Sequence, residues 1–275
     1  KAVITGGSSG ISKAIARAYL EEGALVWIGS RSAEEVEKTV REFGATGEIR
    51  GSALDVSDEA SVGAFADEVK AAWGNMDILV NGAGIYGPIG IVPDVSPKEW
   101  LAALKVNLYG TFLMMHSVAP LMKNGGVVIN FVGGGEGPYP HFSSYVSAKG
   151  GVARLTETAA AELWESNIRV NAIAPGAVNT KFLDDLLAAG PEKAGRANYE
   201  RALKQKESKG VPPEKAAALC VFLASDSARW LTGKILSAVW DPYDKFSEHK
   251  DDILSSDVYT LRRIRPKDRG FAWEE

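Results

Sequence analysis

The sequence predicts an α/β protein built on one doubly wound, mostly parallel sheet of about seven strands, with helices on both faces. Two observations carry this prediction. Short apolar runs of strand length alternate with longer amphipathic stretches along most of the chain. Within the first such stretch, Ile11, Ile15 and Ala18 recur with the period of a helix. Repeated strand–helix alternation requires right-handed crossovers between parallel strands.

Each element has a local signal. The expected strands are Ala2–Thr5, Leu25–Gly29, Glu48–Leu54, Asp77–Val80, Gly126–Val132, Ile168–Ile173 and Lys234–Val239. Ser32 followed three residues later by Glu35 is a capping box that starts a helix, and Ser96 with Glu99 is another. No repeat or linker interrupts the pattern, so we expect one domain over residues 1–240. Residues 241–275 form an aromatic and charged C-terminal extension, expected to pack on the same domain or on a partner subunit.

Composition excludes several classes of function. The net charge of −4 gives no reason to expect nucleic acid as a partner, and no apolar run is long enough to span a membrane. The single cysteine, Cys220, lies in an apolar run, which predicts a buried residue and a reducing, cytoplasmic environment. Three scattered histidines make a metal site unexpected. Because the chain begins at Lys1, the sequence leaves open whether a targeting segment precedes it.

A glycine-rich turn follows the first expected strand and leads directly into a helix. Glycines there let the backbone approach a pyrophosphate, and the helix N-terminus offers free N–H groups and a positive dipole end. The third small position of this turn carries Ser12 in place of glycine. The context predicts a Rossmann-type dinucleotide site, whose loop residues are Gly6, Ser8, Ser9, Gly10 and Ile11.

The end of the second strand indicates which dinucleotide binds. An acidic residue there would bind the ribose hydroxyls of NAD and repel a 2′-phosphate. This chain has Ser30 and Arg31 instead, with no acid before Glu34. A guanidinium suits a 2′-phosphate, so the sequence favours NADP over NAD, although a solvated surface arginine is the alternative.

Tyr145 and Lys149 are four residues apart at the start of an amphipathic helix, so they share one helix face. A tyrosine has an ordinary pKa of about 10, too high for a base near neutrality. A neighbouring ammonium would favour the phenolate and lower that pKa. The pair could then exchange a proton with a carbonyl or alcohol oxygen while hydride moves at the adjacent carbon. A core tyrosine beside an unrelated lysine is the alternative.

Together these motifs resemble the classical short-chain dehydrogenase/reductase family over about residues 1 to 240. The motifs that carry the resemblance, in order, are Thr5–Ile11, Leu54–Val56, Asn81–Gly84, Asn107, Tyr145–Lys149 and Pro175–Thr180. The resemblance implies a sheet order of 3-2-1-4-5-6-7 and a homodimer or homotetramer. It also implies an enzyme that transfers hydride between nicotinamide and a small-molecule secondary alcohol or ketone.

The resemblance also implies roles for individual residues. Asn107 would hold a water in a proton relay that reaches Lys149, and Lys149 would also bind the nicotinamide ribose. Further cofactor contacts are implied for Asp55 and Val56 at the adenine, Asn81, Gly82 and Ala83 along the ribose, and Pro175, Gly176, Val178 and Thr180 around the nicotinamide. Local alternatives are that Asp55 caps the following helix and that Asn107 only binds its own helix backbone.

Two positions depart from the family pattern. The family's second asparagine in its NNAG motif is Gly82, and the family's catalytic serine falls at Val132 or Gly133. The serine orients the carbonyl and stabilises developing charge, and the loss of one such donor elsewhere costs about 2.7–4 kcal/mol. Replacements from the same loop are the backbone N–H groups of Gly133–Gly135, or side chains of Tyr139, His141 or Ser143.

The missing serine keeps two other functions open: a cofactor-binding sensor or assembly protein with weakened catalysis, and an epimerase that uses transient redox chemistry. Phe182, Leu183, Leu186 and Leu187 have helical spacing and are expected to cover the substrate. The basic residues of the extension either pair with its acidic residues or hold an anionic substrate.

Overall fold

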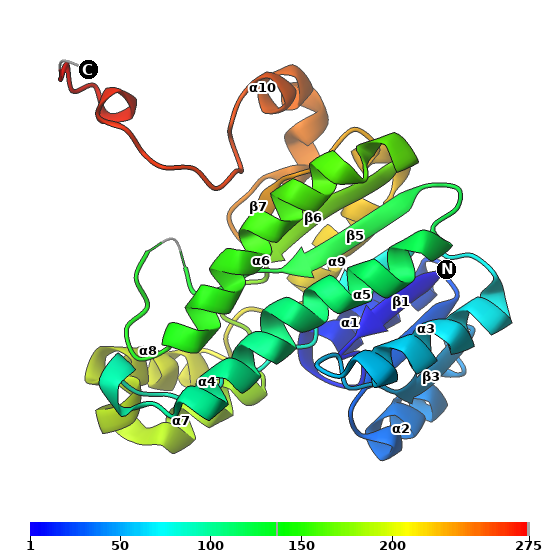
Figure 1. Ribbon diagram of the computed structural model, residues 1–275, viewed down its shortest axis with the longest axis horizontal. Coiled ribbons are helices and arrows are strands. Elements are labelled where there is room, and N and C mark those ends of the chain that lie inside the picture. The colour runs from blue at the N-terminus through cyan, green and yellow to red at the C-terminus, as the bar shows by residue number, and fades with distance from the viewer. Residues whose placement is uncertain (136, 274–275) are drawn as a thin grey trace.

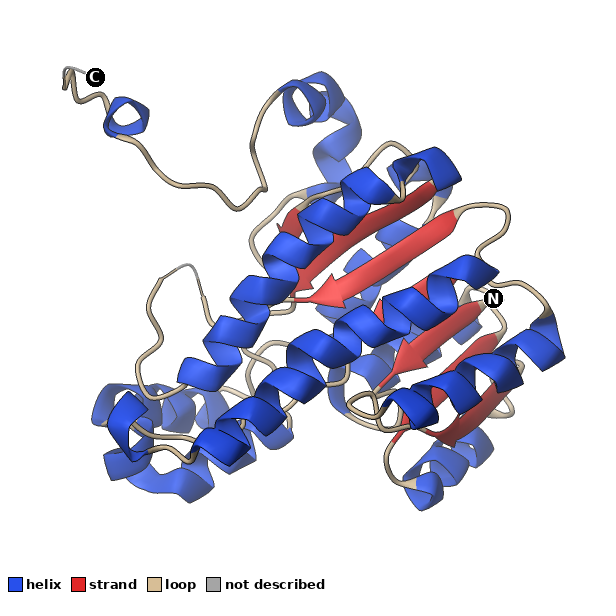
Figure 2. Cartoon of the chain, viewed as in Figure 1, coloured by secondary structure: helices blue, strands red, loops and turns tan. Residues whose placement is uncertain are grey.

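The computed structural model describes residues 1–135 and 137–273. Its centre is a parallel sheet with the strand order β3-β2-β1-β4-β5-β6-β7. The strands are β1 (Ala2–Thr5), β2 (Val26–Ser30), β3 (Ile49–Ala53), β4 (Ile78–Asn81), β5 (Gly126–Phe131), β6 (Ile168–Ala174) and β7 (Ile235–Ser237). Figure 2 shows them as one layer between helices. The fold class and strand order are confirmed, and every strand ends within two residues of its predicted bounds.

Helices cover both faces of this sheet. Their bounds are α1 (Gly10–Glu21), α2 (Ala33–Phe43), α3 (Glu59–Trp73), α4 (Pro97–Leu104), α5 (Gly110–Val118), α6 (Ser143–Glu162), α7 (Lys181–Ala194), α8 (Arg196–Glu207), α9 (Pro213–Ala224) and α10 (Lys250–Ser255). Helices α3, α5 and α6 lie on one face, and α1, α2 and α9 lie on the other (Figure 1). The serine half of both predicted capping boxes is confirmed, since the hydroxyls of Ser32 and Ser96 accept from the backbone N–H of Glu35 and Glu99.

The core forms two apolar layers, one on each face of the sheet. Adjacent strand residues alternate between them, so Val3 packs with α3 and α5 while Ile4 packs with α1 and α9. Both side chains are fully buried, as expected for a parallel sheet covered on both faces. Cys220 is buried in the layer that contains α1 and α9. Among the described residues, no helix is both long and apolar enough to cross a membrane.

The first part of the C-terminal extension packs on its own domain. Phe246 and Ile253 are buried in the core, and Lys234 donates a hydrogen bond to the backbone oxygen of Val258 at 2.9 Å. The backbone N–H of Leu261 donates to Glu157 on α6 at 2.6 Å. Beyond Leu261 the segment extends away from the body of the protein (Figure 1).

Candidate active site

A cleft of about 2510 Å³ opens at the carboxyl ends of the strands. Pockets for one small ligand have volumes of about 300–1,000 Å³, so this cleft has room for a dinucleotide beside a substrate. It includes the ends of β1 and β4, where the strand order reverses and α/β sheets bind their ligands. The predicted residues that line it are Gly6, Ser8, Ser9, Gly10, Ile11, Ser30, Arg31, Asp55, Val56, Gly82, Ala83, Tyr145, Lys149, Pro175, Gly176, Val178 and Thr180.

The glycine-rich turn joins β1 to α1 and requires glycine at two positions. Gly6 has a φ of 70° and Gly10 a φ of 54°, both in the left-handed region. A Cβ at Gly6 would lie 3.2 Å from the Cα of Ala83, and one at Gly10 would lie 3.2 Å from Thr180 Cγ2. The turn therefore presents bare backbone and the N-terminus of α1 to the cleft, which fits the pyrophosphate of a dinucleotide.

Ser12, which replaces the third glycine of the turn, and Gly82, which departs from the family's NNAG motif, lie against each other. Ser12 is buried on α1, and a Cβ at Gly82 would lie 2.1 Å from its Oγ and 3.4 Å from its Cβ. The serine hydroxyl thus occupies the space that any side chain at position 82 would need. A larger residue on the helix is accommodated by a smaller one on the loop after β4.

Ser30 is the last residue of β2, and Arg31 follows it; both line the cleft. The strand therefore does not end in an acidic residue. The backbone N–H of Ser8 donates to Ser30 Oγ at 3.4 Å, which ties the glycine-rich turn to this position. Arg31 is exposed. Its positive charge also contributes to a lowered pKa of Asp55 across the cleft.

Asp55 is fixed by its own loop. Its carboxylate accepts from the backbone N–H of Ser57 at 2.9 Å and from the Ser57 hydroxyl at 2.6 Å. The Ser57 hydroxyl is the main reason that the pKa of Asp55 is lowered. The alternative that Asp55 caps α3 is wrong, because Asp58 caps that helix by accepting from Ser61 N at 2.9 Å.

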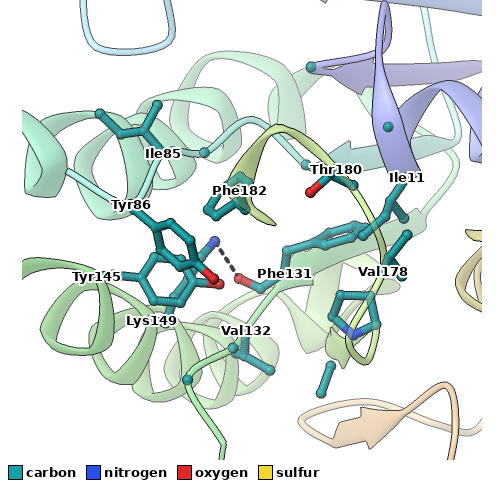
Figure 3. A pocket seen from close by; sticks show the side chains of 18 of the residues that line it. Ile11, Ile85, Tyr86, Phe131, Val132, Tyr145, Lys149, Val178, Thr180 and Phe182 are labelled. Atoms are coloured by element: carbon teal, nitrogen blue, oxygen red, sulfur yellow. Dashed lines mark hydrogen bonds between the residues drawn. The ribbon is translucent and has the colours of Figure 1, made fainter. Parts of the chain in front are cut away.

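Tyr145 and Lys149 extend from the first two turns of α6 toward the end of β5 (Figure 3). The Lys149 Nζ donates to the backbone oxygen of Phe131 at 2.8 Å and lies 6.0 Å from the centre of the Tyr145 ring. Burial lowers the pKa of Lys149 to about 8. Burial is also the main cause of a raised pKa for Tyr145, followed by its interaction with Tyr139. The predicted lowering of the tyrosine pKa is therefore wrong for this structure, because burial of the hydroxyl raises that pKa.

Asn107 lies in a π-helical turn, Lys105–Tyr109, that joins α4 to α5. It is fully buried, and its amide nitrogen donates to the backbone oxygens of Ile85 at 2.8 Å and Ala103 at 2.9 Å. Its amide oxygen accepts from the backbone N–H of Ile85 at 3.2 Å. The side chain thus holds the loop after β4 as well as its own helix. A Cβ at Gly84 would lie 2.8 Å from Asn107 Oδ1 and 3.9 Å from Lys149 Nζ.

Asn81, at the end of β4, is buried beneath the cleft. Its amide nitrogen donates to Asn130 Oδ1 at 2.9 Å, and Asn130 in turn donates to the Thr156 hydroxyl at 3.0 Å. These bonds join β4, β5 and α6 under the floor of the site. Neither Asn81 nor Asn107 is among the described residues that line the cleft.

Gly133, and not Val132, faces the Tyr145 hydroxyl. A Cβ at Gly133 would lie 2.3 Å from the hydroxyl oxygen and 3.2 Å from Cζ of Tyr145. The Val132 side chain points away from Tyr145 (Figure 3) and packs with Val152 and Ala172. Of the two positions predicted for the family's serine, Gly133 is thus the one that faces Tyr145, and the tyrosine hydroxyl itself fills the space beside it.

Aromatic side chains form the wall next to Tyr145. The ring of Tyr86, from the loop after β4, packs edge-on against Tyr145 at 5.0 Å and against Phe182 at 4.6 Å (Figure 3). Tyr139 stacks on Phe142 at 4.4 Å with the ring planes 9° apart. Sequence reasoning identified Phe182 but missed Tyr86. The signal available was an aromatic residue two positions after the Asn81–Gly84 motif, at the carboxyl end of a strand.

The C-terminal extension reaches the cleft through Tyr259, Thr260 and Leu261. Its basic residues are absent from the described residues that line the cleft. Arg262 instead pairs with Asp257 and with Asp268, the latter at 2.6 Å. The alternative in which this basic stretch holds an anionic substrate therefore has no support in this structure.

Fold and site together define a dinucleotide-binding α/β protein with a tyrosine–lysine pair at the carboxyl edge of its sheet. The family profile described as enoyl-(acyl carrier protein) reductase matches residues 6–238. The chain is 36% identical over 239 residues to the 3-oxoacyl-[acyl-carrier-protein] reductase of Thermotoga maritima, an alignment that covers 85% of this chain and 94% of the relative. It is 36% identical over 238 residues to the D-threitol dehydrogenase of Mycolicibacterium smegmatis, with 84% and 88% covered.

The crystal structure of levodione reductase is similar to this fold, with a TM-score of 0.77, 31% sequence identity, and coverage of 86% of this chain and 94% of that one. The chain belongs to the short-chain dehydrogenase/reductase family. It is an oxidoreductase that acts on CH–OH or C=O groups with a nicotinamide cofactor.

Proposed function

We propose that this enzyme transfers hydride between NADP(H) and a secondary alcohol or ketone, with Tyr145 as the acid/base. The observation that carries the proposal is the position of the Tyr145 hydroxyl in the cleft, one helical turn from Lys149 and opposite the bare backbone of Gly133. The cofactor would supply or accept hydride at the carbon whose oxygen meets that hydroxyl. Membership of an oxidoreductase family favours this interpretation over a non-catalytic sensor.

Tyr145 would act first as a proton donor. Because burial raises the pKa of Tyr145, its hydroxyl keeps its proton near neutral pH. That is the form needed to protonate a carbonyl oxygen during reduction. Lys149, held on the backbone oxygen of Phe131, would bind the nicotinamide ribose and carry positive charge toward the tyrosine. Asn107 would support the relay by holding the loop around Gly84 next to Lys149.

The remaining cleft residues would hold the cofactor along its length. The turn from Gly6 to Ile11 would bind the pyrophosphate, and Asp55 with Val56 would flank the adenine. Residues 81–83 would follow the ribose, with Asn81 acting from beneath the floor, and residues 175–180 would frame the nicotinamide. The exposed Arg31 beside Ser30, with no acid at the end of β2, supports NADP over NAD.

The substrate is proposed only as a class. The relatives are named for different substrates, so only the shared ketone or secondary alcohol chemistry is carried over. Tyr86, Phe182 and Leu183 line the substrate end of the cleft and would exclude water there. Arg201 lines the same end and would suit a substrate that carries an anionic group. We further propose a cytoplasmic homodimer or homotetramer.

The test begins with titration of the purified protein with NADPH and NADH, followed by a panel of ketones and secondary alcohols. We expect tighter binding of NADPH and its oxidation by some ketone. Tyr145→Phe should abolish turnover and leave the cofactor dissociation constant largely unchanged. Turnover of that variant at the wild-type rate would overturn the proposal. Cofactor binding with no net turnover of any substrate would favour a sensor, or an epimerase that leaves the cofactor's redox state unchanged.

A further inference from the structure

The family's serine supplies a hydroxyl that this chain must obtain elsewhere, since carbonyl reduction develops negative charge on the substrate oxygen. A serine at position 133 does not fit here, because its Cβ would approach the Tyr145 hydroxyl to 2.3 Å. Val132 is directed into an apolar cluster with Val152 and Ala172. The geometry therefore excludes a side chain at either position as the source of a second donor.

Two of the side-chain candidates on the following loop are engaged outside the cleft. The hydroxyl of Ser143 accepts from Trp100 Nε1 at 3.1 Å, where α6 meets α4. The His141 ring lies against the turn between α7 and α8, where a Cβ at Gly195 would lie 2.7 Å from its Nε2. Neither residue is among the described residues that line the cleft.

Tyr139, the third side-chain candidate on this loop, does reach the cleft. It lines the cleft together with Gly133, Tyr145 and Lys149. Its ring is stacked on the fully buried Phe142, which fixes its plane. It is close enough to Tyr145 to contribute to the raised pKa of that tyrosine. The loop thus carries a hydroxyl to the site from six residues beyond the position where the serine is missing.

Tyr86 lies beside Tyr139 in the same aromatic cluster, and its own ring packs edge-on against Tyr145 at 5.0 Å. Burial raises the pKa of Tyr139, while the Tyr86 hydroxyl and the nearby Arg201 guanidinium act in the opposite direction. These two interactions only partly offset burial, and the pKa of Tyr139 stays raised, so its hydroxyl keeps its proton near neutral pH and can donate a hydrogen bond.

We propose that Tyr139 is a catalytic residue that donates a second hydrogen bond to the substrate's carbonyl oxygen, in the role that Gly133 cannot fill. Tyr145 transfers its proton to that oxygen, while Tyr139 keeps its own proton and stabilises the developing charge. Tyr86 is a positioning residue that orients the Tyr139 hydroxyl. This inference rests on the proposed function and adds to it the identity of the second donor.

The test compares Tyr139→Phe with the matched variant Tyr86→Phe, each removing one hydroxyl from the same aromatic wall. Loss of one oxyanion donor lowers kcat by about 10²–10³-fold, and we expect that loss for Tyr139→Phe. Because the lost interaction forms in the transition state, kcat and kcat/KM should fall together, with the NADPH dissociation constant unchanged. Tyr86→Phe should have a smaller effect, and the double variant should be no slower than Tyr139→Phe alone.

Four outcomes would overturn the inference. Wild-type kcat in Tyr139→Phe would show that Tyr139 is not the donor and would assign that role to the backbone N–H groups of Gly133–Gly135. A larger loss in Tyr86→Phe than in Tyr139→Phe would make Tyr86 the donor. A rise in KM and in the NADPH dissociation constant without a fall in kcat would mean that Tyr139 only shapes the cleft. A wild-type protein that turns over no substrate overturns the proposed function as well, whereas the other outcomes leave it intact.

Discussion

The contact between Ser12 and Gly82 predicts strong energetic coupling between the glycine-rich turn and the loop after β4. Gly82→Ala introduces a Cβ 2.1 Å from Ser12 Oγ and 3.1 Å from the backbone oxygen of Thr5. Overpacking of a core site costs about 1–3 kcal/mol, and we expect the upper half of that range because the Thr5 neighbour is backbone. In the double variant with Ser12→Ala, the hydroxyl is gone. The nearest atom of residue 12 is then its Cβ, which lies 3.4 Å from the new Cβ at position 82, an ordinary contact.

Ser12→Ala should therefore relieve the part of the damage that comes from the contact with Ser12 Oγ, while the 3.1 Å contact with the Thr5 backbone oxygen remains. We expect the double variant to be more stable than the sum of the single effects by about 1–2 kcal/mol, within the range found for residues in contact. The assay is urea unfolding of the wild type, both single variants and the double variant, with the free energy of unfolding extrapolated to water. The dissociation constant for NADPH, measured on the same proteins, should follow the same order.

Gly63→Ala is the matched control for adding a methyl group. Gly63 lies within α3, and a Cβ at this position would meet no heavy atom of the described residues within 4 Å beyond its own helix backbone and chain neighbours. This variant should be stabilised by about 0.5–1 kcal/mol, because alanine is the better helix former. Single effects that add to within about 0.5 kcal/mol would refute the coupling and, with it, the explanation that Ser12 and Gly82 accommodate each other.

Three further variants test other parts of the site. Gly133→Ala should lower kcat about 10²-fold by moving the Tyr145 hydroxyl roughly 1 Å, whereas Gly137→Ala, with open space at its Cβ, should match the wild type in the same kinetic assay. Burial lowers the pKa of Lys149 from 10.5 to about 8, so folding is disfavoured while the lysine is charged. Urea unfolding should show the wild type gaining on the order of 3 kcal/mol over Lys149→Met as pH rises from about 8 to 10.5, and a constant difference would contradict this. Arg31→Ala should weaken NADPH binding about tenfold to a hundredfold and leave NADH unaffected, while Arg41→Ala, a surface variant paired only with Glu37 among the described residues, should change neither dissociation constant.

The strands and helices could be predicted from local pattern because each is specified by its own residues. Apolar runs of strand length, the caps at Ser32 and Ser96, and glycines at the first turn depend on burial, hydrogen bonding and backbone freedom within a few residues. The order of the sheet followed from the family resemblance. The cofactor cleft followed from the same signals, because parallel strands bring the loops after their carboxyl ends to one edge.

Other features depend on residues that are distant in the sequence. The sequence showed that serine is absent near position 133, but only the tertiary structure shows that the Tyr145 hydroxyl lies where its side chain would be. The pairing of Ser12 with Gly82 and of Tyr86 with Tyr139 likewise joins separate loops.

The sequence by itself determined the fold class, the glycine-rich turn and the Tyr145/Lys149 pair, since each is encoded by residue types at short, fixed spacing. Only the tertiary structure decided the direction in which the pKa values of these two residues shift. Burial by the surrounding chain raises the pKa of Tyr145 and lowers the pKa of Lys149, and neither direction follows from the spacing of the two residues along the helix.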